Sequence, residues 1–114
     1  MNREEQNLQI ACVRWFNYQY PKLQGLLFHV PNAAKRGIIE GSMFKRMGVV
    51  AGVPDLIFVY QFCTYAFELK ANKGKLSESQ KVVHQTWNVQ GVKVELVKDV
   101  EEFVKLIKQI IKNE

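Results

Sequence analysis

The chain has 114 residues, of which 47% are hydrophobic and 24% are charged, a balance typical of one compact folded domain. No apolar run reaches the roughly 18 residues of a membrane-spanning helix, and the polar N-terminus does not resemble a signal peptide. Cys12 and Cys63 lack CxxC spacing, which argues against a structural zinc site or a disulfide framework, so we expect a reducing, cytoplasmic setting. The net charge of +5 favours a polyanionic partner, with chance basicity of a small domain as the alternative.

Hydrophobic spacing predicts a helix near each end of the chain. Over residues 4–20, apolar side chains recur at helical intervals until Pro21 stops the helix. Over residues 100–111, apolar side chains fall on one helical face behind Asp99, which suits the N-cap, with Glu102 at the third helical position. Packing alone explains this last helix, so we assign it no chemistry.

Four short segments between these helices are rich in strand-forming residues. Residues 26–30 precede a turn, residues 92–97 alternate apolar and polar side chains, and residues 55–60 and 65–69 are separated by four residues that suit a hairpin. Residues 77–90 read as a helix, with a capping-box pair at Ser77 and Gln80 and a C-terminal stop at Gly91. This order predicts an α/β domain with a small central mixed sheet flanked by helices.

The hairpin places chemically useful side chains on one face. With Tyr60 opposite Tyr65, Asp55 lies across from Lys70, and Glu68 shares the face of Lys70 because strand side chains alternate with a period of two. Two carboxylates are suitable ligands for Mg²⁺ or Mn²⁺, which can activate a water and polarise a phosphoryl oxygen. A neighbouring lysine can orient that water or stabilise charge in the transition state. The alternative is a surface salt bridge on an edge hairpin.

The connector over residues 33–48 is basic and contains three glycines, and we expect a loop with a short helix over residues 42–47. Lys35, Arg36, Lys45 and Arg46 are candidates for phosphate contacts, and a solvated connector is the alternative.

These motifs resemble the VRR-NUC (virus-type replication-repair nuclease) domain of the PD-(D/E)XK nuclease superfamily, over nearly the whole chain taken as one domain, residues 1–114. The likeness rests on short motifs along the chain: Gln9, His29-Val30-Pro31-Asn32, Met47-Gly48, Gly52-Val53-Pro54-Asp55, Glu68-Leu69-Lys70-Ala71, Lys73-Gly74-Lys75-Leu76-Ser77, Gln80 and Gly91-Val92.

The resemblance implies a restriction-endonuclease-like PD-(D/E)XK core and a Mg²⁺- or Mn²⁺-dependent endonuclease acting on DNA. It implies that Asp55 and Glu68 bind the metal with the Leu69 carbonyl, that Lys70 is the catalytic lysine, and that Glu5 supplies a further carboxylate. It also assigns Gln80 to the site, although its side chain has the rival role of capping Ser77. We expect His29 to be a hydrogen-bonded structural residue rather than a general base, and His84 to be a surface or core residue.

The resemblance further implies a compact phage-type member, a homodimer that cuts branched DNA such as four-way (Holliday) junctions. Phosphate contacts are then expected from Lys73, Lys75 and Lys81 besides the four basic residues of the connector. The aromatic cluster of Trp15, Phe16, Tyr18 and Tyr20 is either a dimer contact or core packing. The functional alternative is a non-catalytic or partner-dependent DNA-binding module with the same fold.

Overall fold

The computed structural model describes residues 2–31 and 38–112, with the side chains of residues 38–40 excluded. Its elements in chain order are α1 (Arg3–Gln19), the 3-10 helix η1 (Pro21–Leu23), β1 (Leu27–His29), α2 (Ile38–Arg46), β2 (Leu56–Tyr60), β3 (Cys63–Leu69), α3 (Glu78–Val89), β4 (Val94–Val97) and α4 (Val100–Lys112). The strands form a mixed sheet in the order β1-β2-β3-β4, in which only the β3–β4 pair is parallel. The expected small mixed sheet flanked by helices is therefore confirmed.

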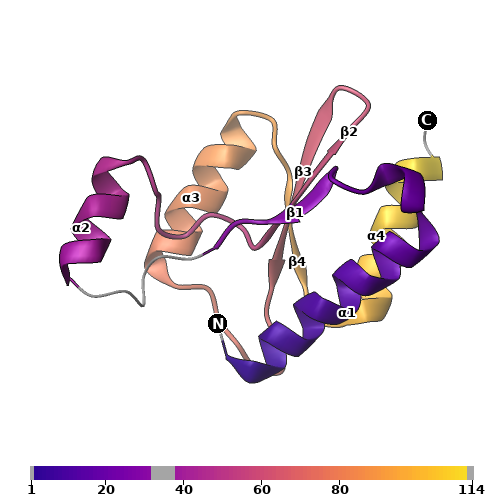
Figure 1. Cartoon of the computed structure of the whole chain (residues 1–114), viewed down its shortest axis with the longest axis horizontal. Helices are drawn as coiled ribbons and strands as arrows, with labels where there is room; N and C mark the ends of the chain where they lie inside the picture. Colours follow the sequence, from indigo (N-terminus) through magenta and orange to yellow (C-terminus); the bar gives the residue numbers. More distant parts are fainter. Residues whose placement is uncertain (1, 32–37, 113–114) are drawn as a thin grey trace.

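The sheet lies between two helical layers (Figure 1): α1 and α4 lie together on one side and α3 on the other, with α2 at the far end beyond α3. The main core fills the space between the sheet and the α1–α4 layer, where Phe16 and Phe58 meet edge to face and Phe67 packs likewise on Phe103. Burial of these rings is the main source of stability, because each removes a large apolar area from water.

The two terminal helices form for the reasons that their sequences indicate. The Asn2 side chain caps α1 by accepting the Glu5 N–H at 2.8 Å, and Asp99 accepts the Glu102 N–H at 2.8 Å at the start of α4.

In the aromatic cluster, Phe16 is fully buried, whereas Tyr18 is 85% exposed. Core packing therefore accounts for part of that cluster, and the exposed ring of Tyr18 points away from it.

The β2–β3 hairpin is present, but its register differs from the expected one. Tyr60 pairs with Cys63 rather than with Tyr65, so the expected pairing of Asp55 with Lys70 is wrong. The strands continue to a two-residue turn at Gln61 and Phe62, both with positive φ (45° and 69°), the twist that joins tight hairpins. That turn is hard to foresee, because neither residue is the usual Gly, Asn or Asp.

The register error amounts to two residues, so it leaves every side chain on its expected face. Asp55, Glu68 and Lys70 therefore still share one side of the sheet, while Phe67 and Leu69 enter the core on the other.

Three other elements differ in extent. Helix α2 begins at Ile38, before the expected 42–47 segment, and β1 and β4 are shorter than the expected strands 26–30 and 92–97. Helix α3 is capped as expected by a reciprocal box between Ser77 and Gln80, and Gly91 follows it with φ 92°. Within the described part of the chain, no helix has both the length and the apolar character needed to cross a membrane.

Candidate active site

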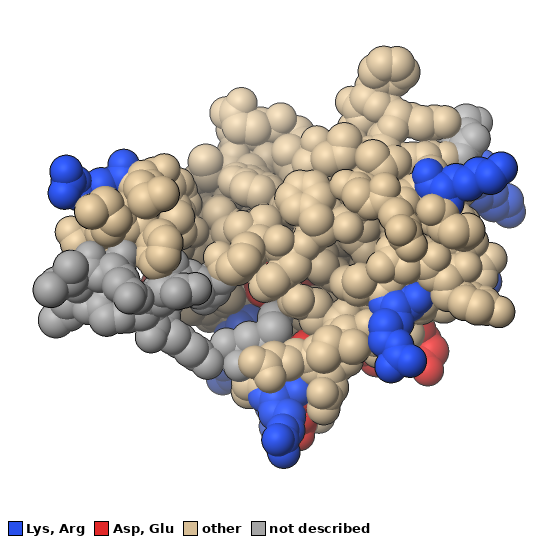
Figure 2. Space-filling model, viewed as in Figure 1, with Lys and Arg blue, Asp and Glu red and all other residues tan. Residues whose placement is uncertain are grey.

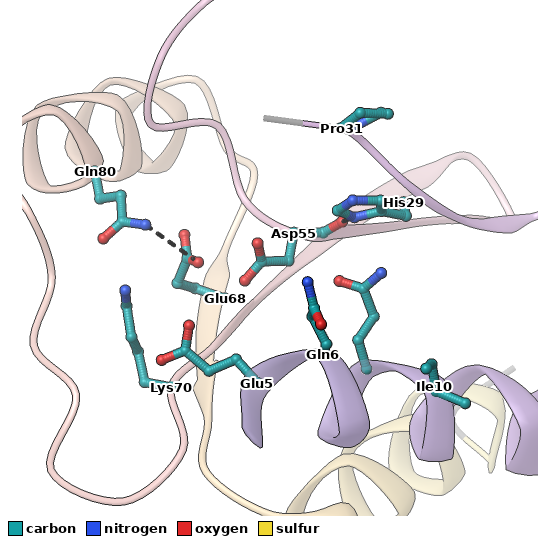
Figure 3. Close-up of a pocket in the computed structure, with 10 residues that line it drawn as sticks. Glu5, Gln6, Ile10, His29, Pro31, Asp55, Glu68, Lys70 and Gln80 are labelled. Atoms are coloured by element: carbon teal, nitrogen blue, oxygen red, sulfur yellow. Dashed lines mark hydrogen bonds between the residues drawn. The ribbon is translucent and has the colours of Figure 1, made fainter. Parts of the chain in front are cut away.

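A cavity of about 490 Å³ opens where α1, the end of β1, the start of β2, the end of β3 and the start of α3 come together (Figure 3). The described residues that line it are Glu5, Gln6, Gln9, Ile10, His29, Pro31, Asp55, Glu68, Lys70 and Gln80. The cavity thus gathers five of the sequence-predicted site residues, Glu5, Asp55, Glu68, Lys70 and Gln80, from four elements or their flanks.

Asp55 sits directly before β2, behind the buried Pro54, and its carboxylate crosses to the neighbouring strand. The Leu69 N–H donates to Asp55 Oδ2 at 2.8 Å. In an extended strand the N–H and C=O of one residue face the same neighbour, so the Leu69 carbonyl is directed to the side where Asp55 lies. The backbone oxygen expected as a ligand therefore shares its side of β3 with the first carboxylate.

Glu68 is the most unusual acid of the site, because only 1% of it is exposed. Burial, with the nearby Asp55 carboxylate adding to it, raises the pKa of Glu68 well above the ordinary value, and Lys70 offsets this only in part. A carboxylate kept out of water beside a second acid favours a proton or a cation.

His84 contacts this buried acid directly. Its Nε2 lies 2.9 Å from Glu68 Oε1, and both side chains are buried. Burial lowers the pKa of His84 and raises that of Glu68, so it disfavours the charged form of both partners in this hydrogen bond. The expectation that His84 is merely a surface or core residue is therefore incomplete. Its position four residues after Gln80, on one helix face, was the signal that could have placed it at the site.

Gln80 makes the contacts that both of its rival roles require. Its Oε1 accepts the Ser77 N–H at 2.8 Å and completes the helix cap, while its Nε2 reaches Glu68 Oε2 at a long 3.5 Å. The amide therefore ties the start of α3 to the acid cluster, as Figure 3 shows.

Lys70 and Glu5 lie side by side at the edge of the cavity, with their ends turned toward Glu68 (Figure 3). A Cβ placed on Gly74 would lie 3.2 Å from Glu5 Oε2 and 3.3 Å from Lys70 Cδ, so both side chains pass over this glycine. Glu5 is buried, with 7% of its surface exposed, and reaches the cavity from α1. The first-helix glutamate is therefore brought to the predicted acids.

A glycine holds the loop before Asp55 against α3. Gly52 has φ 92°, and a Cβ there would lie 2.5 Å from the Ser79 carbonyl oxygen and 2.8 Å from the Gln80 nitrogen. Only glycine fits both the backbone angle and this close approach. The contact brings the strand that carries Asp55 next to the helix that carries Gln80 and His84.

The described residues among the expected phosphate contacts do not line the cavity. Lys45 and Arg46 end α2, Lys73 and Lys75 are exposed in the loop before α3, and Lys81 is exposed on α3, 3.4 Å from Glu78. Lys35 and Arg36 fall outside the described residues. On the face seen in Figure 2, the Lys and Arg side chains are separated by uncharged surface rather than joined in one patch.

His29 is hydrogen-bonded, as expected. Its Nδ1 lies 2.8 Å from the backbone oxygen of Asp55. It also lines the cavity.

The mixed sheet between helices, with two acids and a lysine at one cavity, defines a nuclease-type α/β domain. No protein-family model matches the chain, and no curated protein matches it. A solved structure described as a "VRR_NUC domain protein" is similar over 98% of this chain and 91% of its own, with 26% identity and a TM-score of 0.78. A second, described as "VRR_NUC domain", is 18% identical over 86% of this chain and 91% of its own, with a TM-score of 0.56, and shows the fold alone. The chain is therefore similar over nearly its whole length to a VRR_NUC domain protein, which bears out the resemblance seen in its motifs.

Proposed function

We propose that the chain is a metal-dependent endonuclease that hydrolyses phosphodiester bonds in DNA, with Asp55, Glu68 and Lys70 at its centre. The observation that carries this proposal is the convergence of two carboxylates and a lysine on one cavity, with Glu68 almost fully buried. The similarity to VRR_NUC proteins supports nuclease chemistry, and DNA fits the net charge of +5.

The donor set suits Mg²⁺ or Mn²⁺. In the described part of the chain, no three His, Cys, Asp or Glu side chains cluster closely enough to hold an ion alone. Mg²⁺ needs no such cage, because it usually takes one or two carboxylates and completes its shell with waters and substrate phosphate. Asp55, Glu68 and the Leu69 carbonyl would hold the ion, with Glu5 as a further carboxylate. When bound, the ion would polarise a phosphoryl oxygen and make a water more acidic.

The residues of the chain have separate tasks in this proposal. The Lys70 ammonium would orient the attacking water or stabilise the charge that grows on the phosphoryl oxygens. Gln80 and His84 would hold the Glu68 carboxylate in place through their hydrogen bonds.

We infer that the substrate is branched DNA, such as a four-way junction, cut by a homodimer whose two sites act on two strands. Lys45, Arg46, Lys73, Lys75 and Lys81 would contact phosphates at separated points, with Lys35 and Arg36 in addition. Separated phosphate contacts select for the shape of DNA rather than for its sequence, since the phosphate backbone carries no base information.

Cleavage of a labelled four-way junction beside a matched linear duplex in Mg²⁺ or Mn²⁺ tests the proposal. We expect symmetric nicks in the junction alone, and Asp55→Asn should slow cutting by on the order of 100-fold or more while DNA binding persists. Asp99→Asn is the matched control, because Asn caps a helix as well as Asp does. Unchanged cutting by purified Asp55→Asn protein would refute the role of Asp55. Binding without cutting by the wild-type protein would favour a non-catalytic or partner-dependent DNA-binding module.

A further inference from the structure

The cavity has two chemically different halves. One half holds the carboxylates and Lys70. The other is formed by Gln6, Gln9 and Ile10 of α1 with His29 and Pro31 at the end of β1, and we call these five residues the amide wall. Among the described lining residues, the amide wall has no carboxylate, lysine or arginine. A phosphate is better served by the charged half, so the wall suits a neutral part of the substrate.

His29 fixes the geometry between the two halves. Its Nδ1 contacts the Asp55 backbone oxygen at 2.8 Å. A carbonyl only accepts, so Nδ1 carries the proton and donates it, which leaves Nε2 for another partner. The ring is thereby held at a fixed place relative to the residue whose carboxylate belongs to the acid cluster.

Gln9 provides an acceptor that no described residue uses. Its Oε1 is buried and has no hydrogen-bond partner among the described residues. An unpaired buried acceptor is costly, and an N–H or O–H donor from a bound molecule relieves that cost. An ionised phosphodiester has no such donor, whereas nucleobases do. Ile10 is 54% exposed beside this amide, so it offers apolar surface for the face of a ring.

We propose that the amide wall is a binding subsite for one unpaired nucleotide of the cleaved strand, next to the scissile phosphate. This inference rests on the proposed nuclease function, because it needs the phosphate at the acid cluster. A cavity of about 490 Å³ lies in the size range of small-molecule sites. A paired and stacked base does not enter such a cavity, and removal from the stack is easiest where pairing is already interrupted. The wall therefore gives a reason for selecting branched DNA at the site of chemistry itself.

The test uses the fluorescent base 2-aminopurine, whose emission rises when it leaves the stack. It is placed in turn at each position beside the mapped cut site of a four-way junction, and the protein is added in Ca²⁺ in place of Mg²⁺ to keep the strands intact. We expect one position to brighten with the wild-type protein and with Gln19→Leu, the same change at an exposed site on α1 away from the cavity. Gln9→Leu should lose the signal and weaken binding by about three- to ten-fold. Gln6→Leu is the second wall variant. Gln6 is exposed, so this substitution leaves core packing unchanged.

Three results would overturn the inference. If the junction is bound and cut but no position brightens, the subsite is wrong while the proposed nuclease function stands. If a position brightens equally in both wall variants, the nucleotide is unstacked elsewhere. Failure of the wild-type protein to bind or cut any DNA would remove the proposed function, and the subsite with it.

Discussion

Replacing His84 tests how strongly the buried hydrogen bond prepares Glu68 for a metal ion. His84→Leu removes the partner that stands 2.9 Å from Glu68 Oε1 in a site where the acid is 1% exposed. A hydrogen bond to a charged group contributes about 1.5–3 kcal/mol and one between neutral groups about 0.5–1.5 kcal/mol. Metal binding needs the charged form of Glu68, so the difference of about 1–1.5 kcal/mol weakens metal affinity roughly 5- to 12-fold.

Titration of Mn²⁺ into the DNA-free protein by calorimetry measures this change, with circular dichroism as the check on folding. His84→Gln keeps an N–H donor on the same helix face and should recover most of the lost affinity. Equal Mn²⁺ affinity of the wild-type and His84→Leu proteins, with folding intact, would refute the idea that this contact tunes the acid. Equal loss in His84→Leu and His84→Gln would point to packing rather than to the hydrogen bond.

Three other changes have expected outcomes. Burial and a neighbouring carboxylate raise the pKa of Glu68. Above the ordinary glutamate pKa, the folded metal-free protein therefore keeps a proton on Glu68 that the unfolded chain releases. The free energy of unfolding of the metal-free protein should fall as the pH rises through this range. Glu68→Gln should remove this slope and raise the melting temperature in chelator at pH 8 by several degrees. Gly52→Ala should lower the free energy of unfolding by about 2–4 kcal/mol through the clash with Ser79 and the positive φ. Gly25→Ala is its control in urea unfolding, because it has nearly the same φ and no atom within 4 Å of the added Cβ; an equal cost in both would exclude the clash. Phe62→Gly should stabilise the protein by about 0.5–1 kcal/mol in the same assay, since glycine adopts the φ of 69° freely; a loss of stability would show that the exposed ring contributes to folding.

Sequence patterns were sufficient for the features with a strong period or a local signal. Helix α4 and the cap of α3 follow from side chains within a few residues of one another, and the shared face of Asp55 and Glu68 follows from alternation. Alternation fixes a face but not a pairing, so the hairpin register was missed by two residues.

The parts of the site that sequence did not reveal depend on tertiary packing. The buried partner of His84 becomes visible only when α3 lies on the sheet, and the close approach of Gly52 to Ser79 joins segments that have no local signal in common. Gln80 shows the opposite case, because a local cap and a long-range contact use different atoms of one amide.

The outer strands of the sheet are short: β1 has three residues and β4 has four. Unpaired strand edges are templates on which another chain can add a strand and begin to aggregate. Here Pro31 follows closely after β1 and has no N–H to offer, so the free edge of β1 gives a neighbouring chain few backbone hydrogen bonds. The short edges also disfavour assembly of two copies of the chain by extension of the sheet, and favour docking through side-chain surfaces.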